Sequence, residues 1–241
     1  KSMCDSLKHG GPDDEGIYQS KSCNAVLGHR RLSIIDVSNA GHQPMLYASG
    51  RFIISYNGEL YNYRELKFRL ANEGCSFKTN SDTEVVVAAY VQWGIKCLNE
   101  FSGMFAFAIW DEQTKELLLA RDGAGIKPLY YAYTKEGFAF ASEIRAFKQV
   151  PYLCRENPGW KVYFMAYGHL PEPITTLQKV IPLQKGNYLI YNTQKHAIKI
   201  ETFYKQRFIE KIGNRREAIE LINDGFNKSI KKHLIADASI G

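Results

Sequence analysis

Three short segments carry polar side chains that a strand or a turn would not need for folding. They are residues 29–36 (HRRLSIID), 57–62 (NGELYN) and 79–84 (TNSDTE). The guanidinium of Arg31 can bind a carboxylate through two parallel hydrogen bonds. The carboxylates of Glu59 and Asp82 can hold an ammonium group. The Asn57 amide beside the Gly58 N–H can form a two-donor oxyanion hole. Together these groups predict recognition of a free amino acid, with amide or acyl-transfer chemistry.

Each of these groups also has an ordinary structural interpretation. Arg31 could be a surface arginine, and Asp82 could simply cap a helix. Asn57 and Gly58 could form a plain turn. None of the three segments supplies an assignable nucleophile. The chain has five cysteines, an odd number without a CxxC pair, so the sequence predicts neither a disulfide framework nor a metal site.

The elements that must position these groups are mostly strands. Residues 51–56 (RFIISY) are typical of a strand, which we expect to end in a tight turn at Asn57-Gly58. The continuous apolar run at 104–110 indicates a strand buried on both faces, paired in a hairpin with residues 116–121. Further strands are predicted at residues 129–133, 137–141, 180–191 and 196–204.

Helices are predicted at 63–73 and 82–93, each followed by a glycine, with a short one at 142–148. Residues 150–173 contain four prolines and are predicted to form a loop. Residues 215–234 have the pattern of one amphipathic helix. Its apolar face is Ala218, Leu221, Ile222, Phe226 and Ile230.

Composition excludes several function classes. The 241 residues include 31 Lys and Arg against 25 Asp and Glu, a net charge of +6 that is scattered in pairs, so we expect no nucleic-acid partner. No apolar run approaches the roughly 18 residues of a membrane span. The first 16 residues are polar and lack the features of a secretory signal. The expected location is the cytoplasm.

Eight motifs occur in the order of a known family. They are HGGPDDEG, GHRRLSIID, GHQPM, YNGELYNYREL, SDTEV, GMFAFAIWD, GIKPLYY and FASEI. From about Lys8 onward the chain resembles the class II glutamine amidotransferases, which use an N-terminal cysteine. Within that family it is most similar to the glutamine-hydrolysing asparagine synthetases.

The resemblance implies an α+β fold, a four-layer αββα sandwich of two antiparallel sheets known as the N-terminal-nucleophile hydrolase fold. Residues 1–205 would form the amidotransferase domain without its first segment. Residues 206–241 would begin a C-terminal α/β synthetase domain with its first helix. No cofactor is expected in this chain, because ATP and Mg would bind to the synthetase domain. That domain, L-glutamine and a second copy of the protein are the expected partners.

The resemblance also implies a role for each residue. Arg31 would bind the α-carboxylate of glutamine. Asn57 and Gly58 would donate to the oxyanion, and Glu59 and Asp82 would hold the α-amino group. The pocket wall beside the guanidinium would be Leu32, Ser33, Ile34 and Ile35.

The family nucleophile is a cysteine at the mature N-terminus, whose own α-amino group acts as the base. In the family, more residues separate this cysteine from the residue matching His9 than the eight that precede His9 in this sequence. We therefore expect the chain to be truncated at its N-terminal end, and we expect truncation at its C-terminal end as well. Cys4 is expected to be a helix residue without a catalytic role. Gly10 and Gly123 stand where the family usually has arginine.

Two other functions remain open. Relatives that have lost the cysteine, such as β-lactam synthetases and lasso-peptide cyclases, keep this domain as a non-hydrolytic scaffold. Alternatively, the chain could belong to an amidotransferase with another acceptor. The complete set of Arg31, Asn57-Gly58-Glu59 and Asp82 favours a glutaminase, because a scaffold has no need of a glutamine pocket.

Overall fold

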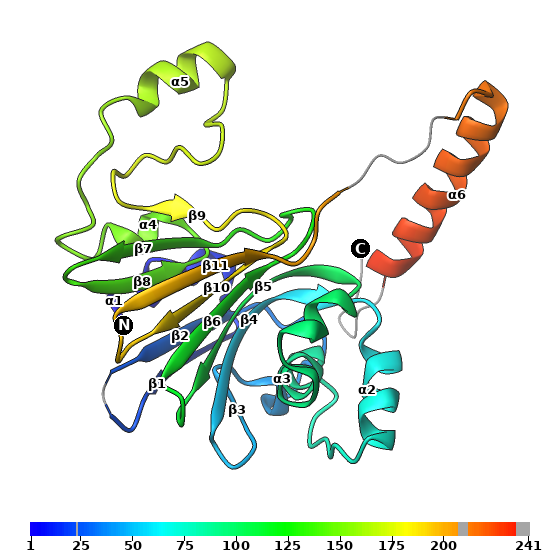
Figure 1. Cartoon of the computed structure of the whole chain (residues 1–241), viewed down its shortest axis with the longest axis horizontal. Coiled ribbons are helices and arrows are strands. Elements are labelled where there is room, and N and C mark those ends of the chain that lie inside the picture. The colour runs from blue at the N-terminus through cyan, green and yellow to red at the C-terminus, as the bar shows by residue number, and fades with distance from the viewer. Residues whose placement is uncertain (23, 207–211, 235–241) are drawn as a thin grey trace.

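Two layers of antiparallel strands form the body of the chain (Figure 1). The computed structural model describes residues 1–22, 24–206 and 212–234. The larger layer is a six-stranded sheet in the order β11-β10-β6-β5-β4-β3. Its strands are β3 (Met45–Tyr47), β4 (Phe52–Leu60), β5 (Gly103–Asp111), β6 (Glu116–Arg121), β10 (Asn187–Asn192) and β11 (Ala197–Thr202).

The second layer consists of two smaller sheets. One pairs β1 (Asp14–Gln19) with β2 (Val26–Arg31). The other has the order β8-β7-β9, with β7 (Tyr130–Thr134), β8 (Gly137–Ala141) and β9 (Ile181–Pro182). Within the described part of the chain, β2 and β8 each pair along one edge only.

Helices cover the outer faces of both layers. α2 (Tyr63–Asn72) and α3 (Asp82–Trp93) pack on the six-stranded sheet in the largest apolar cluster. α1 (Ser2–Asp5) and α4 (Ile144–Phe147) lie against the smaller sheets. A third apolar cluster fills the space between the sheets. The order of layers is therefore α-β-β-α, and the predicted sandwich is confirmed.

The central strand β5 explains the continuous apolar run in the sequence. Phe105 and Phe107 point to the helix layer, whereas Ala106, Ala108 and Trp110 point between the sheets. Because successive side chains of a strand alternate between its faces, a strand buried on both faces needs apolar residues at every position. The small Ala106 and Ala108 also leave room between the sheets, where the cavity described below lies.

The predicted turn at Asn57-Gly58 is wrong. β4 continues through both residues to Leu60 and pairs with β5 along its whole length, with Gly58 opposite Phe105. A Cβ atom on Gly58 would collide with the Met104 carbonyl oxygen. The glycine is therefore needed for close approach of two backbones rather than for a turn.

The predicted loop at 150–173 is also wrong in part, because α5 (Trp160–Tyr167) lies within it. Gly159 and Gly168 bound this helix, and the prolines of the segment all lie outside it. The local breakers thus delimit the helix without preventing it. The predicted strand at 180–191 is wrong as one strand, because it divides into β9, which pairs with β7, and β10, which pairs with β6. The other predicted strands and helices correspond to elements of the structure within a few residues.

The predicted amphipathic helix is present as α6 (Arg215–His233), and its large apolar side chains are exposed. Its end touches the body where the Tyr61 hydroxyl lies 2.8 Å from Nε2 of His233. Of the proposed second domain, residues 207–211 and 235–241 lie outside the described residues. No helix in the described ranges is long and apolar enough to cross a membrane.

Candidate functional site

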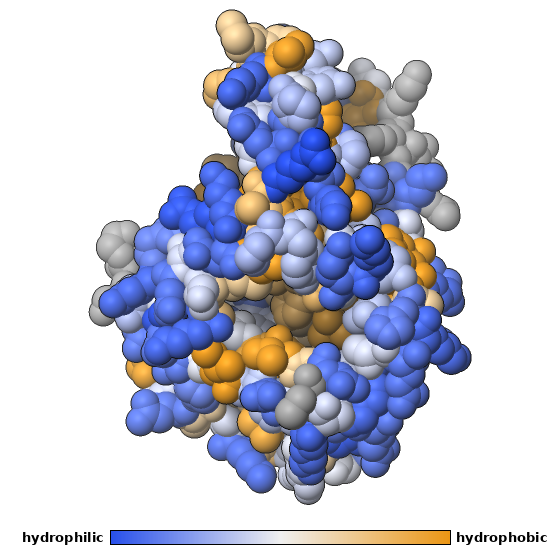
Figure 2. Space-filling view, turned by 90° about the vertical axis from the view of Figure 1, so that its left-hand side faces the viewer, coloured by the Kyte–Doolittle hydropathy of each residue, from blue (hydrophilic) through white to orange (hydrophobic). Residues whose placement is uncertain are grey.

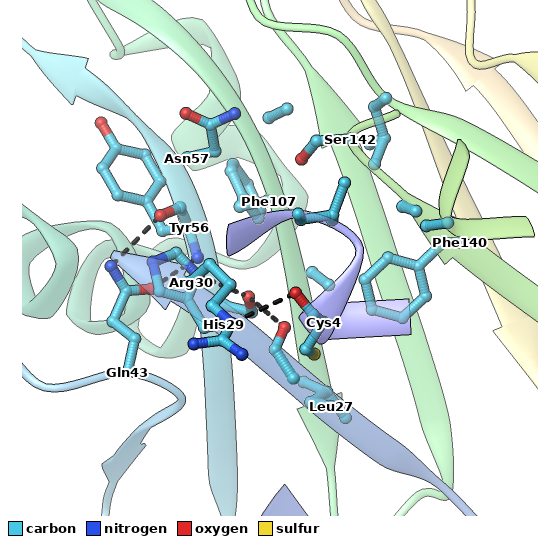
Figure 3. Close-up of a pocket in the computed structure, with 18 of the residues that line it drawn as sticks. Cys4, Leu27, His29, Arg30, Gln43, Tyr56, Asn57, Phe107, Phe140 and Ser142 are labelled. Carbon is cyan, nitrogen blue, oxygen red and sulfur yellow. Dashed lines mark hydrogen bonds between the residues drawn. The ribbon is translucent and has the colours of Figure 1, made fainter. Parts of the chain in front are cut away.

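β2, β4 and the start of α3 converge on a cavity of about 720 Å³ between the two sheet layers. Figure 3 shows His29 on β2 and Asn57 on β4 at one side of it, with Phe140 on the other. Of the residues predicted for the glutamine site, all except Ser33 line this cavity: Arg31, Leu32, Ile34, Ile35, Asn57, Gly58, Glu59 and Asp82. The backbone N–H of Ser33 donates instead to Asp13.

Arg31 ends β2 and is almost fully buried, with 6% of its surface exposed. Its guanidinium donates to the backbone carbonyls of Ser38 (3.0 Å), Ile35 (3.3 Å) and Asp36. These bonds fold residues 32–38 around the charged group. Among the described contacts, they leave the Nε–H and one Nη1–H for a ligand. Arg31 therefore shapes the pocket wall and is not a surface arginine.

Asp36 connects that wall to the start of α3. Its carboxylate accepts the backbone N–H of Asn80 at 3.1 Å and also bonds to Ser38. Burial opposes its negative charge, but the hydrogen bonds from Ser38 and Asn80 hold the pKa of Asp36 below its usual value. Two segments far apart in the sequence are thereby fixed relative to each other.

Asp82 is the first residue of α3, but it is not the cap. The Ser81 hydroxyl caps the helix by accepting the Thr83 N–H at 3.2 Å. Oδ2 of Asp82 instead accepts the Leu60 N–H at 3.0 Å and the Tyr56 hydroxyl at 3.1 Å. Burial raises the pKa of Asp82 to about 6, and the charge of Glu59 also raises it. Both carboxylates are buried at the cavity, an arrangement that a bound cation would stabilise.

Strand alternation accounts for the direction of the Gly58 N–H. Phe105, opposite Gly58, bonds through its backbone to Asp122 on its other side, so the two do not exchange hydrogen bonds. The N–H groups of Tyr56, Gly58 and Leu60 therefore point away from β5 along one edge. The Gln43 side chain accepts the Tyr56 N–H at 2.7 Å, and Asp82 accepts the Leu60 N–H at 3.0 Å. The Gly58 N–H lies between these two bonds.

Sequence reasoning missed two supporting residues. Gln43 is buried, and its side-chain amide bonds both backbone groups of Tyr56, as a neighbouring strand would. Glu84 is buried and accepts the backbone N–H groups of Lys78 and Thr79 at 2.7 to 3.1 Å, which fixes the segment before Ser81. Both lie inside quoted motifs, GHQPM and SDTEV, which was the available signal.

His29 is not suited to act as a base. Its Nδ1 lies 3.1 Å from the Ser55 hydroxyl, and burial together with the positive charge of Arg31 lowers the pKa of His29 to about 4. The ring is therefore neutral at physiological pH.

Cys4 is a residue of α1, as predicted, and its sulfur lies against Gly28 in the cavity wall. Burial raises the pKa of its thiol, which opposes formation of a nucleophilic thiolate. The described residues contain no cluster of three His, Cys, Asp or Glu that could hold a metal ion. The indole Nε1 of Trp110 also lines this cavity region and has no partner among them.

The structure distinguishes the two unusual glycines. A Cβ atom on Gly123 would lie 2.5 Å from the ring of Tyr204, so this aromatic side chain occupies the space that a larger residue would need. Gly10 is unconstrained, because its Cβ would meet only Glu143, at 3.8 Å. Glu143 is already paired with His9 at 2.9 Å and with Arg145 at 3.0 Å.

Curated proteins of known name match this chain along nearly its whole length. Asparagine synthetase (glutamine-hydrolysing) 1 of Bacillus subtilis is 33% identical over 241 residues, which are 100% of this chain and 38% of that protein. Asparagine synthetase 2 of the same organism is 34% identical over 254 residues, 100% of this chain and 33% of its own length. The chain spans from about a third to half of the length of the curated relatives it matches.

Among solved structures, glutamine phosphoribosylpyrophosphate amidotransferase from B. subtilis has a TM-score of 0.64 at 23% identity. The match covers 85% of this chain and 46% of that one, and it shows the same N-terminal-nucleophile hydrolase fold. The model of the glutamine amidotransferase domain matches residues 1–204. The chain therefore belongs to the glutamine amidotransferase domain family.

Proposed function

We propose that the chain forms the glutaminase site of a glutamine-hydrolysing asparagine synthetase. The observation that carries the proposal is the convergence of Arg31, Asp82 and the Gly58 N–H on one cavity. The names of the matching relatives, which specify glutamine hydrolysis, support the same activity. A non-hydrolytic scaffold has no comparable support, because it would not need this arrangement of charges.

In the proposed complex, the α-carboxylate of glutamine lies beside the guanidinium of Arg31. The α-ammonium lies between the carboxylates of Glu59 and Asp82, whose mutual repulsion it relieves. The pocket wall is formed by Leu32, Ile34 and Ile35 with Ser33 behind them. This pose directs the side-chain amide toward Asn57 and Gly58.

The proposed reaction is acyl transfer to a cysteine thiolate. The sulfur bonds to the amide carbon, and the resulting oxyanion accepts hydrogen bonds from the Asn57 side chain and the Gly58 N–H. The C–N bond then breaks, ammonia leaves with a proton from the α-amino group of the cysteine, and water hydrolyses the thioester to glutamate. As the resemblance implies, the cysteine is the N-terminal residue of the protein, upstream of His9.

The cavity offers a place for the segment that carries this cysteine. β2 and β8 both line it, each with one edge that no other described strand pairs with, so an extended segment can add a strand between them. The Nε1 of Trp110, which has no hydrogen-bond partner among the described residues, would meet that segment.

The ammonia would pass to an ATP- and Mg-dependent synthetase region that begins near residue 206, where it would convert aspartate to asparagine. A homodimer in the cytoplasm is the form proposed for the protein.

The test separates the two nitrogen sources. In the full-length natural protein, Asp82→Ala is expected to abolish asparagine formation from glutamine and to leave asparagine formation from added ammonia intact. The acceptor is tested in the same assay by identifying the amidated product. Glutamine-dependent activity that survives Asp82→Ala contradicts the site, and a product other than asparagine contradicts the acceptor.

A further inference from the structure

α5 is apolar on all sides, and none of its residues is buried. Its sequence is WKVYFMAY, with Lys161 as the single charged residue. Met165 is 87% exposed, Val162 is 70% exposed and Tyr167 is 63% exposed. In Figure 1 the helix projects away from the sheets, and Figure 2 shows apolar side chains at the tip of the projection.

The base of this projection is firmly built. Glu156 and Leu177 form a β-bridge, and Asn157 donates its backbone N–H to Thr176 at 2.9 Å. Thr175 is buried and its hydroxyl donates to the Val180 carbonyl at 2.6 Å. The segments on either side of the helix are thus hydrogen-bonded to each other, and they hold the helix away from the body in a defined position.

A helix with these properties is normally covered. Helices that are hydrophobic all round occur in protein interiors, and apolar patches of this kind on a surface mark interaction sites. α6 differs, because it carries ion pairs on its polar face, between Arg216 and Glu220 and between Asp224 and Lys228. A flat partner could cover the apolar stripe of α6, but α5 needs a partner that surrounds it.

The relatives contain a large region outside their match to this chain, and such a region fits that need. The amidotransferase match ends at residue 204, whereas the curated relatives extend to two or three times the length of this chain. α6, the first element beyond the match, also exposes apolar residues, with Ile222 at 69% and Phe226 at 64%. In Figure 1, α5 projects beyond the smaller sheets, whereas α6 lies at the other end of the body and its last residue, His233, contacts Tyr61. A domain continuing from α6 remains tethered to this body, which favours its docking at α5 over docking of an untethered partner.

We propose that α5 is a docking element that inserts into the ATP-dependent synthetase region of the same chain. This inference rests on the proposed function only in requiring that such a region exists in the protein. A second copy of the chain is the competing occupant.

The test measures oxidation of Met165 by hydrogen peroxide in the full-length natural protein. The rate at each methionine is compared with the rate at the same residue after unfolding in urea, by peptide mass spectrometry. Met45, which is 8% exposed, is the buried reference. We expect Met165 to be protected by roughly tenfold or more and to approach Met45, because thioether oxidation depends on exposure. A native rate equal to the unfolded rate would overturn the proposal.

Dilution distinguishes the competing occupant, because protection within one chain does not depend on concentration. Protection of Met165 that disappears when the protein is diluted to monomers would assign α5 to a contact between copies and overturn the proposal. This measurement needs no glutamine, so it stands even if the glutaminase assay fails.

A matched pair of variants tests the functional consequence. Met165→Glu is expected to lower the asparagine formed per glutamine hydrolysed, with hydrolysis itself retained. Phe68→Glu introduces the same charge on α2 at a side chain that is 69% exposed, and it is expected to change neither quantity. Equal coupling in the two variants contradicts a docking role for α5.

Discussion

Oδ2 of Asp82 lies 3.0 Å from the backbone nitrogen of Leu60, two residues beyond Gly58 on the same edge of β4. This bond joins the first residue of α3 to the strand that carries the proposed oxyanion donors. The carboxylate that is proposed to bind the substrate ammonium therefore also fixes the strand edge. The contact between Asp82 and Leu60 therefore affects both binding of the α-amino group of glutamine and positioning of its side-chain amide.

The raised pKa of Asp82 predicts how glutamine use varies with pH. With a pKa of about 6, the carboxylate is charged above pH 6 and becomes neutral below it. A neutral Asp82 cannot attract the substrate ammonium. We therefore expect kcat/KM for glutamine to fall about tenfold per pH unit below pH 6. Ammonia-dependent synthesis, with its rate expressed per concentration of unprotonated NH3, is the control, because it bypasses this site. Parallel pH profiles for the two nitrogen sources would show that Asp82 is not the titrating group.

The same shift predicts that removing the charge of Asp82 stabilises the fold. The folded state binds its proton more tightly than the unfolded state, because burial raises the pKa from 3.8 to about 6. The free energy of unfolding therefore falls as pH rises from about 4 to 6 and stays lower above that range. At pH 7, Asp82→Asn is expected to raise it by about 3 kcal/mol while abolishing glutamine use.

Urea unfolding of this chain measures the change in unfolding free energy caused by Asp82→Asn. Asp111→Asn is the control, and it is expected to change the unfolding free energy in the opposite direction. Hydrogen bonds from Arg51, at 2.9 and 3.2 Å, hold the pKa of Asp111 below its usual value against the effect of burial. Its charge stabilises the fold above pH 4, so the substitution is expected to be destabilising. If both substitutions shift the stability in the same direction, the assigned environment of Asp82 is wrong.

Gly58→Ala tests the close approach of β4 and β5. The added Cβ meets the Met104 carbonyl and the Cα of Phe105, both backbone atoms that cannot move independently. We expect a loss of about 1–3 kcal/mol in unfolding free energy, together with loss of glutamine hydrolysis as the proposed donor is displaced. Gly225→Ala in α6 is the matched control, since nothing lies within 4 Å of its Cβ. Equal stability of the two variants would rule out the steric argument.

The structure brings most of the residues predicted for the glutamine site to one cavity, and their roles there stay predictions. The predicted groups were separated by up to about fifty positions, yet β2, β4 and α3 bring them to one cavity. Local signals failed where long-range pairing decides conformation. Asn57-Gly58 has the composition of a turn, but β5 provides a partner strand through both residues, and the strand continues.

The supporting residues show a different limit. Gln43 replaces a strand neighbour for Tyr56, and Glu84 holds the backbone of Lys78 and Thr79. No sequence pattern predicts that a glutamine or a glutamate side chain will bond to the backbone in this way. The partner is a backbone group that is distant in the sequence or lies in a loop. Gly123 is similar, since Tyr204 lies 81 positions later in the sequence.

Glu84→Gln tests whether the segment before α3 is held by charge. The carboxylate accepts two backbone N–H groups and the Thr79 hydroxyl, and such charge-assisted bonds are worth about 1.5–3 kcal/mol each. The amide keeps one acceptor oxygen, which can take the place of Oε2, and its NH2 group then replaces Oε1 and faces the Lys78 N–H, a donor. We expect lower stability in urea and a raised KM for glutamine with ammonia use unchanged. Glu65→Gln, exposed on α2, is the control and is expected to be silent.

The two glycines that replace family arginines should respond differently when the arginine is restored. Gly123→Arg places a side chain where the ring of Tyr204 lies, so we expect the melting temperature of the chain to fall by several degrees, in keeping with an overpacking cost of about 1–3 kcal/mol. Gly10→Arg enters open space near the Glu143 carboxylate and is expected to be neutral or slightly stabilising. Combining Gly123→Arg with Tyr204→Ala removes the obstructing ring and should recover most of the lost stability. A double variant no more stable than Gly123→Arg alone would mean that the ring is not what excludes the arginine.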